Sequence, residues 1–200
     1  MHTLCKLPFF GVAEVSGADA AEFLHSQLSN HILDLQPGEA CFATYNSPRG
    51  RVLANMLVLR RADRFLLVMA ADLLEATIKR LRMFVLRSKT VFHTDSAWQV
   101  YGQSGADTGA DAAALKFAAE EGENGLITLA LAGGNRILLS SVPLPDTDHP
   151  AAAEAWQAAG ILQGRPWISQ PTVESCVAQM LNQHLLGGVH FKKGCYPGQE

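Results

Sequence analysis

The 200-residue sequence lacks the features that mark secreted, disulfide-rich and membrane-spanning proteins. It has only four cysteines, too few for a disulfide scaffold and too scattered for a C-x-x-C pair: Cys5, Cys41, Cys176 and Cys195. No apolar run approaches the ~20 residues that a membrane span requires. The N-terminus lacks the charged start, apolar stretch and small-residue cleavage site of a secretory signal. We therefore expect reduced thiols and a cytoplasmic protein with no membrane partner.

Charge is also scarce, at 18% of residues with a formal net charge of −3. This balance gives no global electrostatic reason to bind nucleic acid or anionic lipid, so any RNA contact needs a local basic patch. Lys79, Arg80 and Arg82 lie off the apolar stripe of a predicted helix, and we interpret them mainly as a solvated face. Hydrophobic residues make up 48% of the chain, which excludes disorder and suits one large or two small folded domains.

Metal-binding spacing is missing as well, although seven histidines are present. His184 and His190 together with Cys195 do not match zinc-finger spacing. We expect no preformed metal site. A single exposed thiolate at Cys195 would suit passing contact with iron better than stable chelation.

Apolar periodicity predicts an alternation of helices and short strands. Helices are expected from Ala20 to about Asn30, along the stripe Leu74, Ile78, Leu81 and Val85, around 110–119, and from Pro150 to just before Gly160; strands are expected at 41–45, 52–59, 65–70, 91–93, 99–101, 126–130 and 136–140. Gly133-Gly134-Asn135 is the predicted turn of the last hairpin. The order indicates an α+β fold of the ferredoxin-like type, with a mainly antiparallel sheet and helices on one face.

The C-terminal residues predict an activated thiol. Val189 to Lys193 alternates apolar and polar side chains like a half-buried strand, and Tyr196-Pro197-Gly198-Gln199 has proline and glycine where a type II turn needs them. If Gln199 and Glu200 open a helix, free helix amides and the lysines before Cys195 favour thiolate over thiol. A buried, inert cysteine is the alternative, and the residue pattern alone leaves both open.

The segment 187–200 resembles the signature of the YgfZ family, folate-binding relatives of the glycine-cleavage aminomethyltransferases, whose usual form is K-G-C-Y-x-G-Q-E. Upstream, Gln179 to Asn182 resembles the family's P-Q-x-x-N-L segment, with Ala178 replacing its proline and Gln183 its leucine. Val15 to Leu24 is similar to the opening that these proteins share with the aminomethyltransferases. The likeness involves both ends of the chain and is weaker in the middle.

The resemblance implies a fold of two interleaved ferredoxin-like modules, as in the aminomethyltransferases. By that resemblance, residues 1–45 and 150–200 form one discontinuous module and residues 46–149 form the other. Family members continue into a C-terminal β-barrel. We therefore expect this chain to be part of a longer protein whose barrel would lie beyond Glu200.

The resemblance also implies site residues and a cofactor. It makes Cys195 the reactive thiol, supported by its motif neighbours Lys193, Gly194, Tyr196, Gly198 and Gln199, and it makes tetrahydrofolate or a derivative the cofactor. Trp156 matches a folate-associated tryptophan, and Phe10 falls where the family has another. Asn55 could hold the pterin, and Arg165 is a candidate contact for the acidic tail or a phosphate because of its charge. Ordinary core packing is the alternative for both aromatic residues.

Glycine cleavage itself is disfavoured. Ala54-Asn55 occupies the place of the aminomethyltransferases' catalytic aspartate pair, and an asparagine cannot ionise. The resemblance instead implies an accessory protein of iron-sulfur cluster assembly or maintenance, whose partners are client or assembly proteins, including tRNA-modifying enzymes. A folate-dependent one-carbon transferase and a non-catalytic folate-binding module stay open, as do the folate form and the oligomeric state.

Overall fold

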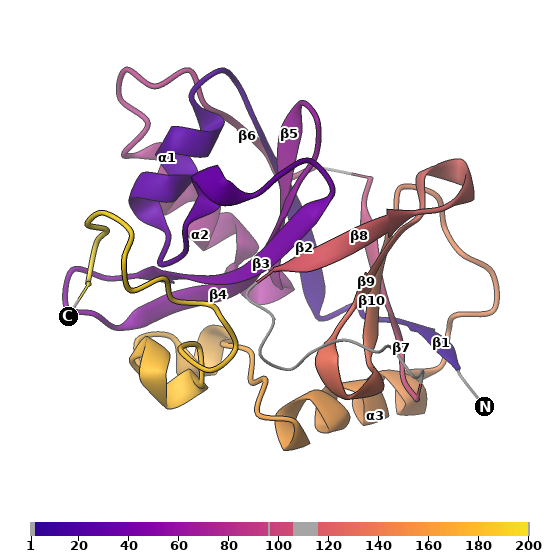
Figure 1. The fold of residues 1–200 in the computed structure, drawn as a ribbon. Helices are drawn as coiled ribbons and strands as arrows, with labels where there is room; N and C mark the ends of the chain where they lie inside the picture. The colour runs from indigo at the N-terminus through magenta and orange to yellow at the C-terminus, as the bar shows by residue number, and fades with distance from the viewer. Residues whose placement is uncertain (1–2, 96, 106–115, 200) are drawn as a thin grey trace.

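The computed structural model describes residues 3–95, 97–105 and 116–199, and within them it contains one ten-stranded sheet (Figure 1). The strand order is β1-β7-β10-β9-β8-β3-β4-β5-β2-β6 with every pairing antiparallel. The strands are β1 (Leu4–Lys6), β2 (Phe10–Ser16), β3 (Glu39–Asn46), β4 (Val52–Arg60), β5 (Arg64–Ala70), β6 (Val91–His93), β7 (Gln99–Gln103), β8 (Phe117–Glu121), β9 (Ile127–Ala130) and β10 (Arg136–Ser140). The helices are α1 (Ala20–Gln27), α2 (Ala71–Arg82) and α3 (Pro150–Leu162), and short 3₁₀ turns include Ile32–Asp34, Gln170–Thr172 and Ala178–Leu181.

The strands β2 to β5 are buried on both faces and separate two hydrophobic cores. Along β4, Met56 and Val58 point into the first core, while Leu57 and Leu59 point into the second. This alternation is the two-residue period of a strand. Because both faces of β4 are buried, its sequence is a nearly continuous run of apolar residues. The α1 and α2 helices close the first core with their apolar stripes.

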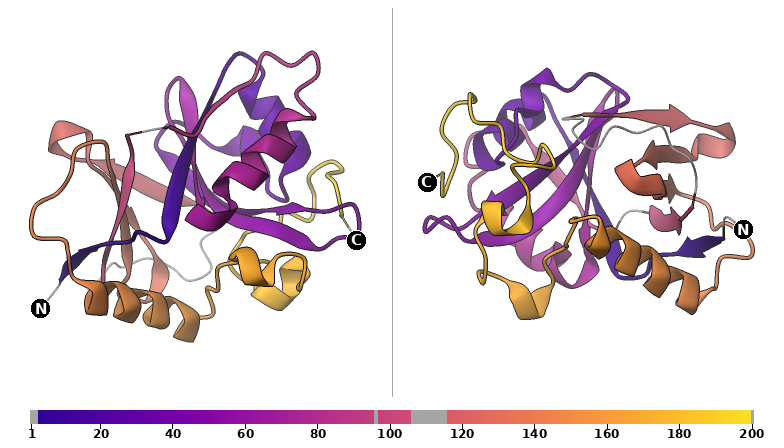
Figure 2. Two further views of the ribbon diagram at one scale, coloured as in Figure 1. Left: turned by 180° about the vertical axis from the view of Figure 1, so that it is seen from behind. Right: turned by 60° about the horizontal axis from the view of Figure 1, so that its bottom comes forward.

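The second core lies between the other face of these strands and the strands β7 to β10, with α3 along its lower side (Figure 2). Ile137 and Leu139 of β10 point into it, and so does Trp156 of α3. The prediction that all helices lie on one face is therefore wrong, because α3 packs on the opposite side from α1 and α2. The α+β class and the antiparallel sheet are confirmed.

The predicted strands β4 and β5 and the Gly133-Gly134 turn between β9 and β10 are confirmed within a residue, and the helices α1 and α2 are confirmed, although each ends about three residues earlier than predicted. Of the helix predicted around 110–119, residues 110–115 lie outside the described residues. Phe117 to Ala119 instead belong to β8, because Phe117 packs against Phe42 with ring centroids 5.3 Å apart and β8 pairs with β3 and β9. The α3 helix also passes through Gly160, and the bond from the Arg165 amide to the Gly160 carbonyl closes its end.

The division into 1–45 with 150–200 and 46–149 stays a prediction. In the structure β2 pairs with β5 and β3 pairs with β4, so the first 46 residues share one sheet with the strands that follow them. No helix among the described residues is long and apolar enough to cross a membrane.

Candidate functional site

The C-terminal segment 187–199 packs against the loop that follows α1 and is hydrogen-bonded to it (Figures 1 and 2). The Ser29 hydroxyl donates to the Gly188 carbonyl at 2.5 Å, and the Asn30 side-chain amide donates to the Gly187 carbonyl at 2.6 Å. The His190 amide in turn donates to the Ser29 carbonyl at 3.0 Å. Ser29 and Asn30 are themselves buried, so these bonds fix the path of the chain toward Cys195.

The predicted strand from Val189 to Lys193 is wrong. Phe191, expected on the buried side, is 70% exposed, while Lys193 is only 7% exposed. The reason is a specific long-range contact, because the Lys193 ammonium donates to the backbone carbonyls of His25 and Leu28 at the end of α1. These carbonyls have no partner inside the helix, and a cation at a helix C-terminus is electrostatically favourable.

The Lys193 ammonium is therefore bound at the C-terminal end of α1. Burial lowers the pKa of Lys193 to about 8. Its ammonium also lies 4.9 Å from the centre of the Tyr196 ring, which links two residues of the motif. Gln199 is not helical, and Glu200 lies outside the described residues. Of the groups that were expected to activate Cys195, Lys193 is thus engaged at the end of α1, Lys192 is exposed, and no helix begins at Gln199 within the described part of the chain.

Cys195 itself is exposed, which favours the reading of an accessible thiol over a packed one. The predicted type II turn after it is confirmed: the Gln199 amide donates to the Tyr196 carbonyl at 3.2 Å, and Gly198 has φ of 71°. Beside this turn is a groove of about 290 Å³, bordered by Asn46, Gly50, Gln179, Phe191 and Tyr196 among others. Cys195 is not among the residues that line the groove.

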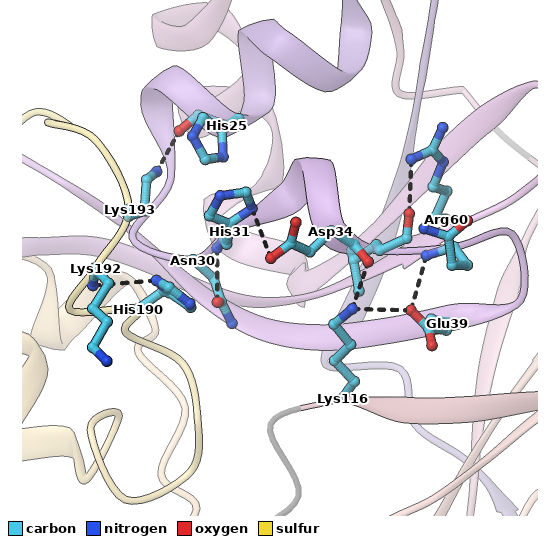
Figure 3. Close-up of polar contacts among 12 residues, drawn as sticks. His25, Asn30, His31, Asp34, Glu39, Arg60, Lys116, His190, Lys192 and Lys193 are labelled. Carbon is cyan, nitrogen blue, oxygen red and sulfur yellow. Dashed lines mark hydrogen bonds and ion pairs between the residues drawn. The ribbon is translucent and has the colours of Figure 1, made fainter.

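Three histidines meet where the segment joins α1 (Figure 3). The rings of His25 and His31 have centroids 4.5 Å apart, and those of His31 and His190 are 5.2 Å apart. Asp34 lies 3.3 Å from His31 Nδ1, and His190 Nδ1 accepts from the Lys192 amide at 3.3 Å. Sequence reasoning missed this cluster, because His190 joins His25 and His31 only when the C-terminal segment packs against the loop after α1.

The cluster predicts a loss of stability in mild acid. Burial, then Lys193 and His31, lower the pKa of His25 below its ordinary value of 6.5. The unfolded chain therefore binds a proton that the folded chain resists, so stability falls as pH drops through 6.5 toward the folded pKa. Urea unfolding at pH 7.5 and 5.0 should show a smaller loss for His25→Gln than for the unsubstituted protein. The exposed His149→Gln is the control; equal losses in all three proteins would contradict this assignment.

The candidate folate residues gather at a different place. A cavity of about 310 Å³ opens between the β1–β2 loop, the start of α2, α3 and residues 167–169. Phe10 lines it, with its ring centroid 4.6 Å from that of Trp167 and 4.9 Å from that of Phe9. Asp72, Gln157 and Ser169 supply the polar part of the lining. We call this the aromatic cavity.

Trp156 supports the aromatic cavity from behind. It is 2% exposed, its indole N–H donates to the Arg136 carbonyl at 3.1 Å, and its ring meets that of Phe10 edge-on at 5.9 Å. A Cβ on Gly102 would come within 2.7 Å of the indole, so the ring packs directly on the β7 backbone. Trp156 is not among the residues that line the cavity.

Asn55 holds the backbone on either side of Trp167, and Arg165 lies two positions before that tryptophan. The Asn55 amide donates to the Pro166 carbonyl at 2.8 Å and accepts from the Ile168 amide at 2.7 Å. Arg165 is 6% exposed and donates to the Ala132 carbonyl at 2.5 Å, and burial lowers its pKa. Neither side chain lines the cavity: Asn55 positions Trp167 in its wall, whereas Arg165 binds the loop between β9 and β10.

The structure thus places the Cys195 motif and the candidate folate residues at two different sites. Cys195 and its motif lie against the β3–β4 turn, whereas Phe10 and its neighbours form the aromatic cavity. Trp167 and Asp72 were missed. Trp167 had a usable signal, because it directly follows Arg165-Pro166 in the stretch that aligned Trp156, whereas Asp72 had none beyond its place at the start of a helix. Within the described ranges, no group of three or more histidine, cysteine or acidic residues is placed to hold a metal.

Comparisons with known proteins agree with the fold and with the resemblance to YgfZ proteins. No family model matches the chain. It is 26% identical to the tRNA-modifying protein YgfZ of Enterobacter sp. (strain 638), over 99% of this chain and 66% of that protein, and 27% identical to YgfZ of Edwardsiella ictaluri, over 99% and 65%. An uncharacterized protein of Haemophilus influenzae is 27% identical over 100% and 67%.

Among solved structures, the glycine cleavage system aminomethyltransferase T of Bartonella henselae superposes with a TM-score of 0.57 at 19% identity, covering 79% of this chain and 45% of that one. This likeness shows a shared fold. The chain spans about two thirds of the length of the YgfZ proteins that it matches. The similarity covers nearly the whole chain, and it makes these YgfZ proteins distant homologues of the chain.

Proposed function

We propose that this chain binds a reduced folate and supports the assembly or maintenance of iron-sulfur clusters in client enzymes, including those that modify tRNA, through the thiol of Cys195. The observation that carries the proposal is the aromatic cavity, because Phe10 lines it, Trp156 packs behind Phe10, and Asn55 holds the backbone around Trp167 in its wall. The relatives named as tRNA-modifying proteins support the choice of clients.

The aromatic cavity suits a pterin by size and chemistry. Ligand pockets typically begin near 300 Å³, so about 310 Å³ holds the pterin and leaves the aminobenzoyl spacer and acidic tail to extend outward. Phe10 and Trp167 offer flat walls, and the Asp72 carboxylate offers an acceptor for the amino and ring N–H donors at the pterin edge. No arginine or lysine lines the cavity, so the tail of the ligand would lie in solvent.

Cys195 has the setting of a transient ligand. It is exposed on a short loop between two anchors, the buried Lys193 on one side and the turn at Gly198 on the other. Thiolates are soft ligands that suit iron, and a single exposed thiol exchanges its partner more readily than a closed chelate. The other cysteines are less accessible, since Cys5 and Cys41 are buried and Cys176 is half-buried.

Folate binding is expected to depend on Trp167. With 5-formyltetrahydrofolate at 100 times its Kd, the unsubstituted protein should gain about 2.7 kcal/mol of stability, which raises Tm by several degrees. Trp167→Ala should lose this gain because it removes one wall of the aromatic cavity. Trp98→Ala, outside the cavity, should keep it. Thermal unfolding with and without the ligand measures both, and a full gain in Trp167→Ala would remove the cavity from the proposal.

Removing the Cys195 thiol is expected to abolish cellular function without changing the affinity for folate. In cells lacking their own YgfZ-type protein, Cys195→Ala should fail to restore the activity of iron-sulfur enzymes, while its stabilisation by 5-formyltetrahydrofolate is unchanged. Cys176→Ala should restore activity. Full restoration by Cys195→Ala would leave a non-catalytic folate-binding module as the better account.

One-carbon transfer is a weaker candidate. The Asn55 amide is engaged by backbone groups through both its nitrogen and its oxygen, so it serves to position residues 166–168. It also cannot ionise to act as a base or to stabilise a developing cation. Incubation with methylene-tetrahydrofolate and an amine donor should therefore give no turnover.

A further inference from the structure

A second cavity lies on the opposite side of the central strands from the aromatic cavity. It has a volume of about 330 Å³ and opens between α2, the β3–β4 hairpin and residues 170–173. Its walls are mostly apolar: Leu53, Leu73, Ala76, Met83 and Val173, with the Tyr45 ring. Tyr45 and Leu73 belong to the first core, whereas Phe10 belongs to the second, and no residue lines both cavities.

The charged residues of this second cavity are all cationic. Lys79 and Arg80 line it from α2, and no aspartate or glutamate is among its lining residues. Arg80 lies against the Tyr45 hydroxyl, where its charge opposes the rise that burial causes in the Tyr45 pKa. Such a pair of positive groups beside an apolar wall attracts an anion that carries an apolar body.

Arg80 also has an unused donor. Its Nε atom is buried and has no hydrogen-bond partner within the described part of the chain. Buried polar atoms are nearly always paired, and an unpaired one calls for a ligand, a water or an ion. A carboxylate is the natural complement, because its two oxygens match the planar fork of a guanidinium.

We propose that the second cavity is a binding site for a small aryl carboxylate, whose ring lies among Leu53, Met83 and Val173 and whose carboxylate pairs with Arg80. Lys79 at the rim adds long-range attraction without a fixed geometry. The site is independent of folate binding in the aromatic cavity and of the Cys195 segment.

The test uses 2-naphthoate and its uncharged analogue 2-naphthamide, titrated calorimetrically at constant ionic strength. The unsubstituted protein should bind the acid at least tenfold more tightly than the amide. Arg80→Met should abolish that preference, because it keeps the apolar stem and removes the charge. Arg87→Met removes an exposed cation that does not line the cavity, and it should keep the preference.

A variant that places a larger side chain in the second cavity tests whether the ligand binds there. Ala76 is exposed on α2 and lines the cavity, so Ala76→Phe should weaken both ligands at least tenfold while the protein stays folded by circular dichroism. The proposal is overturned if 2-naphthoate shows no binding, if acid and amide bind equally, if Arg80→Met keeps the preference, or if Ala76→Phe binds the acid unchanged.

Discussion

Gly198→Ala is expected to release the Cys195 segment from the body of the protein. Gly198 has φ of 71°, and a Cβ there would lie 2.2 Å from the Ser47 carbonyl oxygen and 3.0 Å from Gly50 Cα. The left-handed backbone alone costs about 1–3 kcal/mol for a residue with a side chain, and the collision is with backbone that cannot turn away. The turn at residues 196–199 can therefore no longer pack against the β3–β4 hairpin.

Trypsin reports this release. In the unsubstituted protein the Lys193 side chain is held at the end of α1, so cleavage after Lys193 should be slow. In Gly198→Ala it should be at least tenfold faster, because the anchor next to Cys195 is lost. Gly194→Ala is the matched control within the same motif, since a Cβ at Gly194 meets nothing within 4 Å. If both variants resist trypsin like the unsubstituted protein, the segment is not held in the way described.

Trp156→Ala is expected to cost the most stability of any single change considered. Removing a fully buried tryptophan typically costs about 3–5 kcal/mol, which corresponds to a fall in Tm of roughly 10 °C or more in a chain of this size. Here the indole packs on Gly102, meets Phe10 and satisfies the Arg136 carbonyl. Urea unfolding measures the loss.

Trp156→Phe separates packing from direct ligand contact. It keeps an aromatic ring but leaves the Arg136 carbonyl without its donor, so a smaller loss of about 1–3 kcal/mol is expected. Folate stabilisation should persist in Trp156→Phe. If Trp156→Ala instead unfolds at the same urea concentration as the unsubstituted protein but no longer responds to folate, the indole lines the ligand site and is not a core residue.

Local patterns predicted those parts of the molecule whose structure depends on nearby residues. The period of β4 and β5, the stripe of α2 and the Tyr196-Pro197-Gly198-Gln199 turn all follow from residues within a few positions. The segment Val189 to Lys193 failed because its alternation has no neighbouring strand to pair with. Lys193 finds its partners in His25 and Leu28, more than 160 positions away, and no local rule anticipates that contact.

The candidate site shows the same division. Phe10 and Asn55 were chosen from the resemblance, but their separate roles, one lining the aromatic cavity and the other clamping residues 166–168, depend on tertiary contacts. Trp167 lines the cavity where Asn55 fixes the backbone on both sides of it and its ring packs against Phe10. The separation of Cys195 from the aromatic cavity is likewise a property of the assembled sheet, in which the β3–β4 turn and the start of α2 lie apart.

The most direct measurement is a fluorine NMR titration of the protein labelled with 5-fluorotryptophan, which gives one signal for each of its three tryptophans. Adding 5-formyltetrahydrofolate should shift the Trp167 signal most, the Trp156 signal less, and the Trp98 signal least. Assignment follows from Trp→Phe variants at each position. An unmoved Trp167 signal at saturating ligand, or a shift confined to Trp98, would contradict folate binding in the aromatic cavity.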